Sequence, residues 1–263
     1  MLGVGFVAPG LRSWAAAEPV LGGRAPYRGA PLEHDVPDLL PPAERRRAAP
    51  ATRLALAVAE QALAHAGAAR DAVASVFATV DGDTETCNHI CASLATPAPE
   101  ISPIRFHNSV HNAASGYWSI ASGCRAPSTT VCGRDDVFAV GLLEAAVQAV
   151  TERRTVLLVV YELPAPEPLY SLRPLDVGAG VALALAPGAQ ARGRARLALE
   201  RAAPAAAPTE LVAPELEALR RANPALRALP LLGAIARGDA ASLLLATESG
   251  GPLQVRVDAR TGA

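Results

Sequence analysis

Short runs of continuously apolar residues alternate along this chain with longer segments in which apolar residues recur every three or four positions. The runs VASVFATV (73–80) and TVLLVVYE (155–162) predict strands that are covered on both faces, and residues 4–7 predict an earlier strand. Strands that alternate with amphipathic helices are typical of an α/β domain with helices layered on a sheet. The predicted helices cover 52–67, with Thr52 as N-cap and Gly67 as the stop, 84–95, 108–123 and 136–152.

The flanks of this region follow less regular patterns. Residues 13–50 are rich in Pro, Gly and Arg and predict an irregular excursion. After residue 162, the runs 180–188 and 194–202 predict the two strands of a hairpin or edge pair. An Ala/Pro linker at 202–208 precedes a predicted helix at 210–222, a helix or strand at 228–236, and strands at 242–248 and 253–259.

Composition narrows the possible functions. With 263 residues, 51% of them hydrophobic, and a formal charge of −1, the sequence is typical of a globular protein, and it offers no basic surface for nucleic acid or an anionic membrane. The sequence contains no lysine, which excludes a Schiff base. Neither a signal peptide nor a spanning apolar run is evident, and the four cysteines are unevenly spaced, so we expect reduced thiols and a cytoplasmic location.

A metal site is the first candidate chemistry. Cys87 and Cys91 are four residues apart, so a helix places both thiols on one face, but His89 falls on the other side. Cys124 and Cys132 do not lie in the Cys-x-x-Cys spacing of a zinc knuckle. We therefore expect no metal site and no cofactor.

The segment RFHNSVHNAASGYW (105–118) concentrates histidine, asparagine and aromatic residues around small ones. His107 or His111 could serve in acid–base catalysis, but this reading needs an exposed nucleophile. The alternative is an interface helix whose small residues permit close approach and whose aromatic residues anchor a partner. We favour the interface.

A strand, a turn and a helix follow in the segment from Gly123 to Val150, an arrangement that presents nucleophiles at a helix N-terminus. The turn reads Gly-Arg-Asp-Asp. Asp135 or Asp136 before the apolar helix is a predicted N-cap, a role that explains the two carboxylates without catalysis.

The segment APSTTVCGRDDVFAVGLLEAAVQAV resembles the β-ketoacyl synthase stretch in which Gly-Pro-Ser precedes a strand, a Thr-Ala-Cys nucleophile and its helix. HNAASGYWSIASGCRAP is similar to the family helix that precedes it. The resemblance implies a truncated thiolase-like layered fold with helices packed on a mixed sheet. It implies one domain over 1–263, in which 1–162 resembles the N-terminal half of the fold and 163–263 is a reduced C-terminal part. In the family the nucleophile lies seven residues after the Ser, a count that reaches Asp135 from Ser128.

The family's other catalytic groups have no counterpart here. Its two further histidines and its lysine are missing, because no His follows position 111 and no Lys exists, and the chain is shorter than a complete two-halved fold. The resemblance therefore implies no catalytic residue and no condensation by this chain alone. It implies a chain length factor of type II polyketide or fatty-acid-like biosynthesis. The Phe-His-Asn-Ser-Val-His-Asn stretch most resembles the factors of bacterial aryl polyene pathways.

Such a factor forms a heterodimer with a full-length ketosynthase and meets the acyl carrier protein through that complex. Two alternatives stay open: a small acyltransferase or thioesterase using Cys132 with His107 or His111, and a docking module for an acyl carrier protein. The residues implied at the acyl tunnel end and partner interface are His111, Ser115, Tyr117 and Trp118, and those implied on the interface strand are Ser128 and Thr130.

Overall fold

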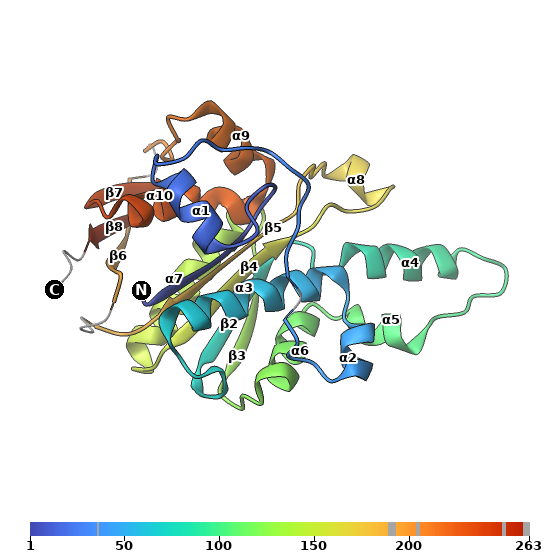
Figure 1. Ribbon diagram of the computed structural model, residues 1–263. Coiled ribbons are helices and arrows are strands. Elements are labelled where there is room, and N and C mark those ends of the chain that lie inside the picture. Colours follow the sequence, from blue (N-terminus) through green and yellow to red (C-terminus); the bar gives the residue numbers. More distant parts are fainter. Residues whose placement is uncertain (36, 189–192, 204–205, 249–250, 260–263) are drawn as a thin grey trace.

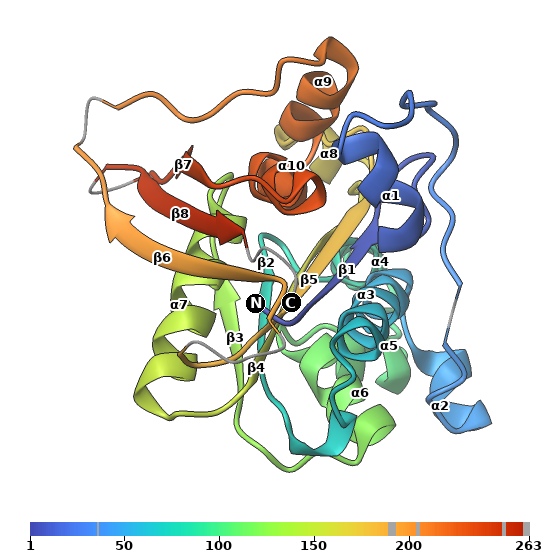
Figure 2. The same cartoon turned by 60° about the vertical axis from the view of Figure 1, so that its left-hand side comes forward.

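A mixed five-stranded sheet forms the centre of the chain, with helices on both of its faces (Figures 1 and 2). The computed structural model describes residues 1–35, 37–188, 193–203, 206–248 and 251–259. The strand order is β1-β5-β4-β2-β3; β4, β2 and β3 run parallel, and β5 pairs antiparallel with both β1 and β4. The strands are β1 (Gly3–Val7), β2 (Ala74–Thr79), β3 (Ser128–Cys132), β4 (Val156–Glu162) and β5 (Ala179–Leu185).

The continuously apolar runs are buried strands, as predicted. Every residue of β1, β2, β4 and β5 is buried, whereas β3 is the partly exposed strand at one end of the sheet. Successive side chains point to opposite faces, so each strand supplies both layers of the core. The sequence therefore identified these strands because a strand that is covered twice needs no polar alternation.

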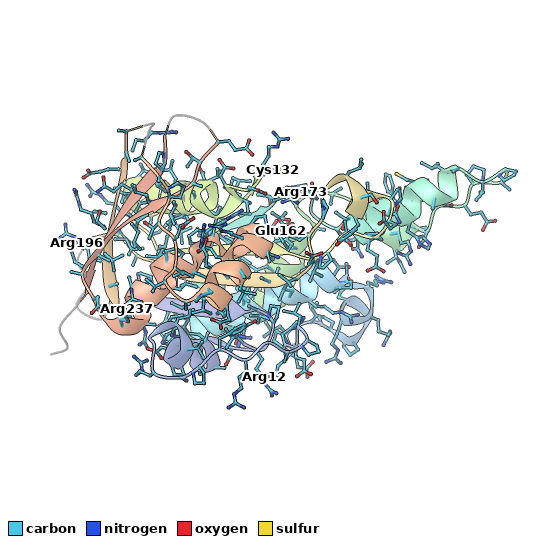
Figure 3. All side chains as sticks on the ribbon, turned by 90° about the horizontal axis from the view of Figure 1, so that it is seen from above. Arg12, Cys132, Glu162, Arg173, Arg196 and Arg237 are labelled. Carbon is cyan, nitrogen blue, oxygen red and sulfur yellow. The ribbon has the colours of Figure 1, made fainter. Side chains whose placement is uncertain are left out.

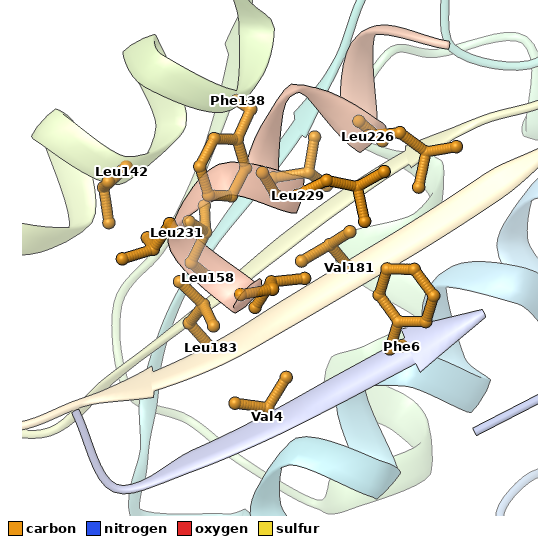
Figure 4. Close-up of a cluster of buried hydrophobic side chains, with 14 of the residues drawn as sticks. Val4, Phe6, Phe138, Leu142, Leu158, Val181, Leu183, Leu226, Leu229 and Leu231 are labelled. Atoms are coloured by element: carbon orange, nitrogen blue, oxygen red, sulfur yellow. The ribbon is translucent and has the colours of Figure 1, made fainter. Parts of the chain in front are cut away.

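Two hydrophobic layers enclose the sheet. On one face the strands pack against α3 (Pro50–Ala66) and α6 (Ala113–Ser122), and on the other against α7 (Val137–Thr151) and the segment 224–237. Figure 4 shows the second layer, where side chains of β1, β4 and β5 meet Phe138 and Leu142 of α7. The leucines that close this layer are Leu226, Leu229 and Leu231.

The helix at 52–67 is confirmed with a shifted start. α3 begins at Pro50 after Ala49, so Thr52 lies inside the helix and not at its N-cap. Proline is favoured at the first helical position because its missing N–H has no partner there. Gly67 ends the helix in the left-handed conformation, as predicted.

The single helix predicted at 108–123 is wrong. The chain forms α5 (Pro103–Asn108) and α6 with a turn between them. Asn108 explains the break, because its buried side chain donates to the Arg47 carbonyl oxygen (2.8 Å) and accepts from the Tyr117 hydroxyl (3.1 Å). These bonds fix the end of α5 against two other elements. The predicted helix at 84–95 is confirmed as α4 (Thr84–Leu94), and α4 and α5 project together from the body of the molecule (Figure 1).

The region 13–50 is not entirely irregular. It contains α1 (Trp14–Leu21), capped by the Ser13 side chain, and α2 (Pro42–Arg47). Trp14 and Val20 of α1 bury against the core despite the internal Pro19.

The hairpin predicted from 180–188 and 194–202 is also wrong. β5 is central in the main sheet, whereas β6 (Ala195–Arg201) pairs with β8 (Leu253–Ala259) in a second sheet of order β6-β8-β7, with β7 at Ala241–Leu245. β5 lies between β1 and β4 and hydrogen-bonds with both, so it is not available to pair with β6. The remaining elements are η1 (Arg70–Ala72), α8 (Leu169–Leu172), α9 (Pro214–Ala222), η2 (Pro224–Ala228) and α10 (Leu229–Arg237). Within the described ranges, no helix has the length and apolar character that a bilayer requires.

Candidate functional site

The carboxyl ends of the three parallel strands meet at one edge of the main sheet, the place where α/β folds bind ligands. Polar residues from these strand ends and from the chain after β4 gather there. Figure 3 shows Cys132, Glu162 and Arg173 in one region, remote from Arg12, Arg196 and Arg237. We call this group the carboxyl-edge cluster: Asp81, Cys132, Asp135, Glu162, Arg173 and Arg227.

Glu162 is the buried carboxyl group of the cluster. It ends β4, is 3% exposed, and its Oε1 accepts a hydrogen bond from the Thr79 hydroxyl (2.8 Å) and one from the Val80 N–H. Burial raises its pKa to about 7, against the opposing effect of these two donors. Such a shift is common in functional sites and in buried structural carboxyl groups alike.

The Cys132 thiol donates to the Val80 carbonyl oxygen at 3.0 Å. Partial burial raises the pKa of this thiol, and the nearby Asp81 and Glu162 carboxyl groups raise it further. A nucleophilic cysteine needs the opposite environment, because the thiolate is the reactive form. The cluster therefore disfavours activation of Cys132.

Asp135, at the position counted from Ser128, forms ion pairs and does not cap a helix. Its carboxylate lies 3.5 Å from Arg173 Nη2 and 3.6 Å from Arg227 Nη2, and Arg173 also binds Asp81 at 2.7 Å. The N-cap prediction for Asp135 is thus wrong. Two arginines from the chain after β4 take up its charge.

Asp136 holds the N-cap position of α7, but its carboxylate serves other donors. One oxygen accepts from the Arg134 N–H (3.2 Å), and the other accepts from the Glu248 N–H (3.0 Å). It makes no side-chain bond to the first turn of α7. The two aspartates therefore connect the turn to the later part of the chain.

Neither candidate base hydrogen-bonds Cys132 in the described ranges. The His107 ring stacks edge-on against Tyr117, with the ring centroids 6.0 Å apart, and His111 lies beside Gly82. Among the described residues, neither imidazole hydrogen-bonds Cys132, and Nε2 of His111 is buried with no partner. The small-enzyme alternative therefore has no hydrogen-bonded Cys132–histidine pair among the described residues.

The outer edge of β3 is the second candidate region, and it has no neighbouring strand among the described residues. Ser128 and Thr130, predicted on an interface strand, are used within the chain. The Ser75 hydroxyl donates to Ser128 Oγ (2.9 Å), and the Thr130 and Ser115 hydroxyls are 3.3 Å apart. These contacts tie β3 to β2 and to α6.

Tyr117 and Trp118 do not reach the surface of α6. Each is 1% exposed and belongs to the hydrophobic layer beneath the helix, so neither touches a partner directly in this conformation. The outward positions are Gly116, where an added Cβ meets open space, and Ile120, which is 51% exposed. We call β3 and these two α6 positions the free edge.

The four cysteines, which we expected not to bind metal, do not belong to a cluster of metal ligands in the described residues. Cys87 and Cys91 lie on α4, and no set of three His, Cys, Asp or Glu side chains positioned for a metal ion occurs in the part of the chain that the structure describes.

Sequence reasoning did not identify the partners of Asp135. Arg173 follows α8 and Arg227 lies in η2, 38 and 92 positions away, and neither belongs to a local motif. Glu162 did carry a signal, because it is the one charged residue that ends a continuously apolar strand.

The sheet order and the strand–turn–helix at the carboxyl edge define a ketosynthase-type fold. The chain belongs to the β-ketoacyl synthase family: the family profile described as β-ketoacyl synthase, N-terminal domain, matches residues 18–241. No curated protein sequence matches the chain.

Three solved structures share this fold over nearly the full length of both chains. A ketosynthase (ApeO) in complex with its chain length factor (ApeC) from Xenorhabdus doucetiae has 23% identity and a TM-score of 0.69, covering 98% of this chain and 97% of the other. The ishigamide ketosynthase/chain length factor has 17% identity and a TM-score of 0.68, covering 97% and 98%. A type II polyketide synthase acyl-carrier protein in complex with its ketosynthase has 10% identity and a TM-score of 0.72, covering 98% of each chain.

Proposed function

We propose that this chain is a non-catalytic chain length factor that pairs with an active ketosynthase and shapes the end of its acyl tunnel. The process is polyketide assembly, of the aryl polyene type that residues 106–112 resemble. The matched chains in two ketosynthase/chain length factor complexes have nearly this length and support the assignment.

One observation carries the proposal: at the family's nucleophile position, the carboxylate of Asp135 lies between two arginines. A carboxylate paired in this way supplies no thiolate for acyl transfer, and the neighbouring Cys132 has a raised pKa and no histidine bonded to it. The carboxyl edge is arranged for internal contacts and not for covalent catalysis.

The free edge is where the ketosynthase binds. An edge strand presents unpaired N–H and C=O groups, and a partner strand added there continues the sheet. Helices α6 and α7 pack beside β3, and their aliphatic side chains Ile120, Val147 and Val150 are exposed. A permanent heterodimer of this kind buries on the order of 2,000 Å² or more.

Within this arrangement α6 sets how far an acyl chain extends. Tyr117 and Trp118 fix the helix from the core, the Ser115 and Thr130 hydroxyls hold it against β3, and Gly116 leaves room at its surface. His111, in the turn before α6, lines the near end of the same wall. A pocket floor selects chain length by steric overlap, about 1–3 kcal/mol for each methylene.

Coexpression with a full-length ketosynthase from the same genome tests the proposal. We expect a stable one-to-one complex in sedimentation analysis, and intact masses that show acylation of the ketosynthase but not of this chain. The chain expressed alone should aggregate through β3. A thermally stable monomer that does not bind the ketosynthase, or an acyl adduct on Cys132, contradicts the proposal.

A pair of substitutions tests the tunnel wall. Gly116→Phe fills the open space outside α6 and should shorten the products, whereas Gly116→Ala should leave their length unchanged. Association must be measured for both variants alongside product mass. If Gly116→Phe stays associated and makes products of unchanged length, α6 does not set chain length.

A further inference from the structure

The second sheet has a border strand whose outer side has no strand neighbour among the described residues. β6 pairs with β8 on one side only (Figure 2). We call its other side the β6 border, which comprises the outward backbone groups of Ala195–Arg201. The β6 border and the free edge belong to different sheets, so the two surfaces are distinct.

Pairing with β8 determines which backbone groups of β6 face outward. The Ala202 N–H donates to the Pro252 carbonyl oxygen (2.9 Å), and hydrogen-bonded pairs alternate along an antiparallel ladder. The even-numbered residues of β6 therefore bond to β8, and the odd-numbered residues direct their N–H and C=O groups outward. In the described ranges, no hydrogen bond reaches the outward groups of Leu197 or Leu199. The middle of β6 is open for pairing with another strand.

A groove of about 340 Å³ opens beside the β6 border. Its aliphatic lining comes from three elements: Leu197 and Leu199 of β6, Leu142 and Ala149 of α7, and Leu185 of β5. These side chains belong to the hydrophobic layer between the sheets and α7 or pack against it, so the layer is not closed at this border. A strand added to β6 directs every second side chain into the groove.

The sequence of β6, ARLALER, is complementary to itself in the antiparallel direction. When two copies are centred on Ala198, Leu197 of one copy lies opposite Leu199 of the other. These two leucines then form the hydrogen-bonded pairs, because both direct their backbone groups outward. The backbone groups and the apolar side chains therefore require the same register.

The charges of β6 agree with this register. Arg196 of one copy lies opposite Glu200 of the other, and opposite charges at such positions stabilise an antiparallel pair. Arg196 is exposed and forms no ion pair within the part of the chain that the structure describes (Figure 3). Glu200 pairs with Arg256 on β8 and keeps an exposed side to accept a second guanidinium.

We propose that β6 pairs antiparallel with β6 of a second copy of this chain, about a two-fold axis at Ala198. Residues opposite one another share a face of the sheet, so each copy places Leu197 and Leu199 over the groove of the other. Both copies use the same patch, so the contact closes on itself and does not extend into a fibre. The inference goes beyond pairing with a ketosynthase, because β3 lies in the other sheet. The expected assembly contains two copies of each chain at the same one-to-one ratio.

Ala198→Cys tests the position of the two-fold axis. Opposite residues at a position without hydrogen bonds have Cα atoms about 4.5 Å apart, which a disulfide can bridge. In the complex with the ketosynthase, oxidised glutathione should link two copies of the variant chain, and peptide masses should locate the link at the introduced cysteines. Ser242→Cys is the matched control, because Ser242 on β7 and Ala198 on β6 both lie opposite Arg256. The control should not form this link.

Ala198→Asp should separate the two copies. Within one chain the new carboxylate lies opposite Arg256, which favours folding, but across the two-fold axis it meets the same charge. We expect the dissociation constant of the two-copy assembly to rise about a hundredfold or more in sedimentation analysis. Ser242→Asp places the same charge opposite the same arginine from β7, and it should leave the dissociation constant unchanged.

Three results overturn the proposal: particles that contain a single copy of this chain, equal linking of the two cysteine variants, or unchanged association of Ala198→Asp. Slow amide exchange at Leu197 and Leu199 in a single-copy complex shows that another partner covers the β6 border, and it also contradicts the proposal. The disulfide joins two copies of this chain, so its formation does not depend on the ketosynthase. Failure of ketosynthase pairing is detected separately, by the absence of the ketosynthase from the particle.

Discussion

The carboxyl-edge cluster and the free edge lie at two borders of the same sheet and differ in how their polar groups are used. At the cluster, every carboxylate has a donor: Glu162 binds Thr79 and Val80, and Asp135 binds two arginines. At the free edge, β3 pairs only with β2 among the described residues. One border is satisfied within the chain and the other is not.

This difference separates chemistry from assembly. When the charges at a border neutralise one another, few of them remain to stabilise the charge that develops in a reaction. Catalysis needs groups that become fully paired only in the transition state. A border with unpaired backbone groups and exposed aliphatic side chains is stabilised by a partner. Substitutions that affect one border and leave the other intact test this separation.

The largest effect is expected from Trp118→Ala. The indole is 1% exposed inside the layer beneath α6, so its loss leaves a cavity and should cost about 3–5 kcal/mol of unfolding free energy. Chemical denaturation measures this loss, and Ile120→Ala on the same helix should change stability by less than about 0.5 kcal/mol. Unchanged stability with longer products would place Trp118 at the partner after all.

Ile120→Arg should have the converse effect. The Ile120 side chain, two positions after Trp118, faces outward, so the variant should fold normally. Its affinity for the ketosynthase should fall roughly thirtyfold, as expected for the loss of a central interface residue. Pull-down titration of the complex measures the loss. Val212→Arg, at a fully exposed position outside the free edge, is the matched control. Equal effects of the two charges would show that α6 is not the interface.

Glu162→Gln should change the pH dependence of stability. Burial raises the folded pKa to about 7 from the ordinary 4.5, so the contribution of Glu162 is fully present below pH 4.5 and is lost as pH rises through 7. The glutamine keeps an oxygen that accepts from Thr79 and Val80, but it cannot ionise. Between pH 5 and 8, the free energy of unfolding of the variant should therefore rise by up to about 3 kcal/mol relative to the unsubstituted chain. Thermal melts across this range test it, with exposed Glu152→Gln as the control.

The smallest effect is expected at Asp135. Its side chain is 66% exposed and its ion pairs are long, so Asp135→Asn should cost less than about 1 kcal/mol. Asp135→Cys should remain free of acyl adducts in intact masses, because neither His107 nor His111 is hydrogen-bonded to this turn in the described residues. An adduct on the new cysteine would show that the carboxyl edge retains catalytic capacity.

The strands and the longer helices were predictable because their signals are local. A strand buried on both faces is apolar throughout. Gly67 ends α3 in the left-handed conformation, which glycine adopts more readily than other residues. α1 was missed because Pro19 interrupts a short alanine-rich segment. The β5 and β6 runs are adjacent in sequence, which suggested a hairpin, but the pairing depends on β1, at the far end of the chain.

The candidate site was half predictable for the same reason. A count from Ser128 located Asp135, but its role as an ion-pair partner depends on Arg173 and Arg227, which no local pattern connects to it. Tyr117 and Trp118 were assigned to the acyl tunnel end and partner interface by their chemical type. Their burial depends on which face of α6 meets the sheet, and the break at Asn108 sets that orientation.

The pairing of the first strand has a consequence for the order of synthesis. Gly3 of β1 lies opposite Ala184 of β5, so the strand made first finds its only strand neighbour in the described sheet after about 180 further residues have been made. Until then its apolar side chains can be shielded by α3, which packs against β1 in the finished fold. The pairing of β2 with β3 and with β4 does not require β5. Because β5 follows β2, β3 and β4 along the chain, the parallel part of the sheet can form during synthesis before β1 acquires its strand neighbour.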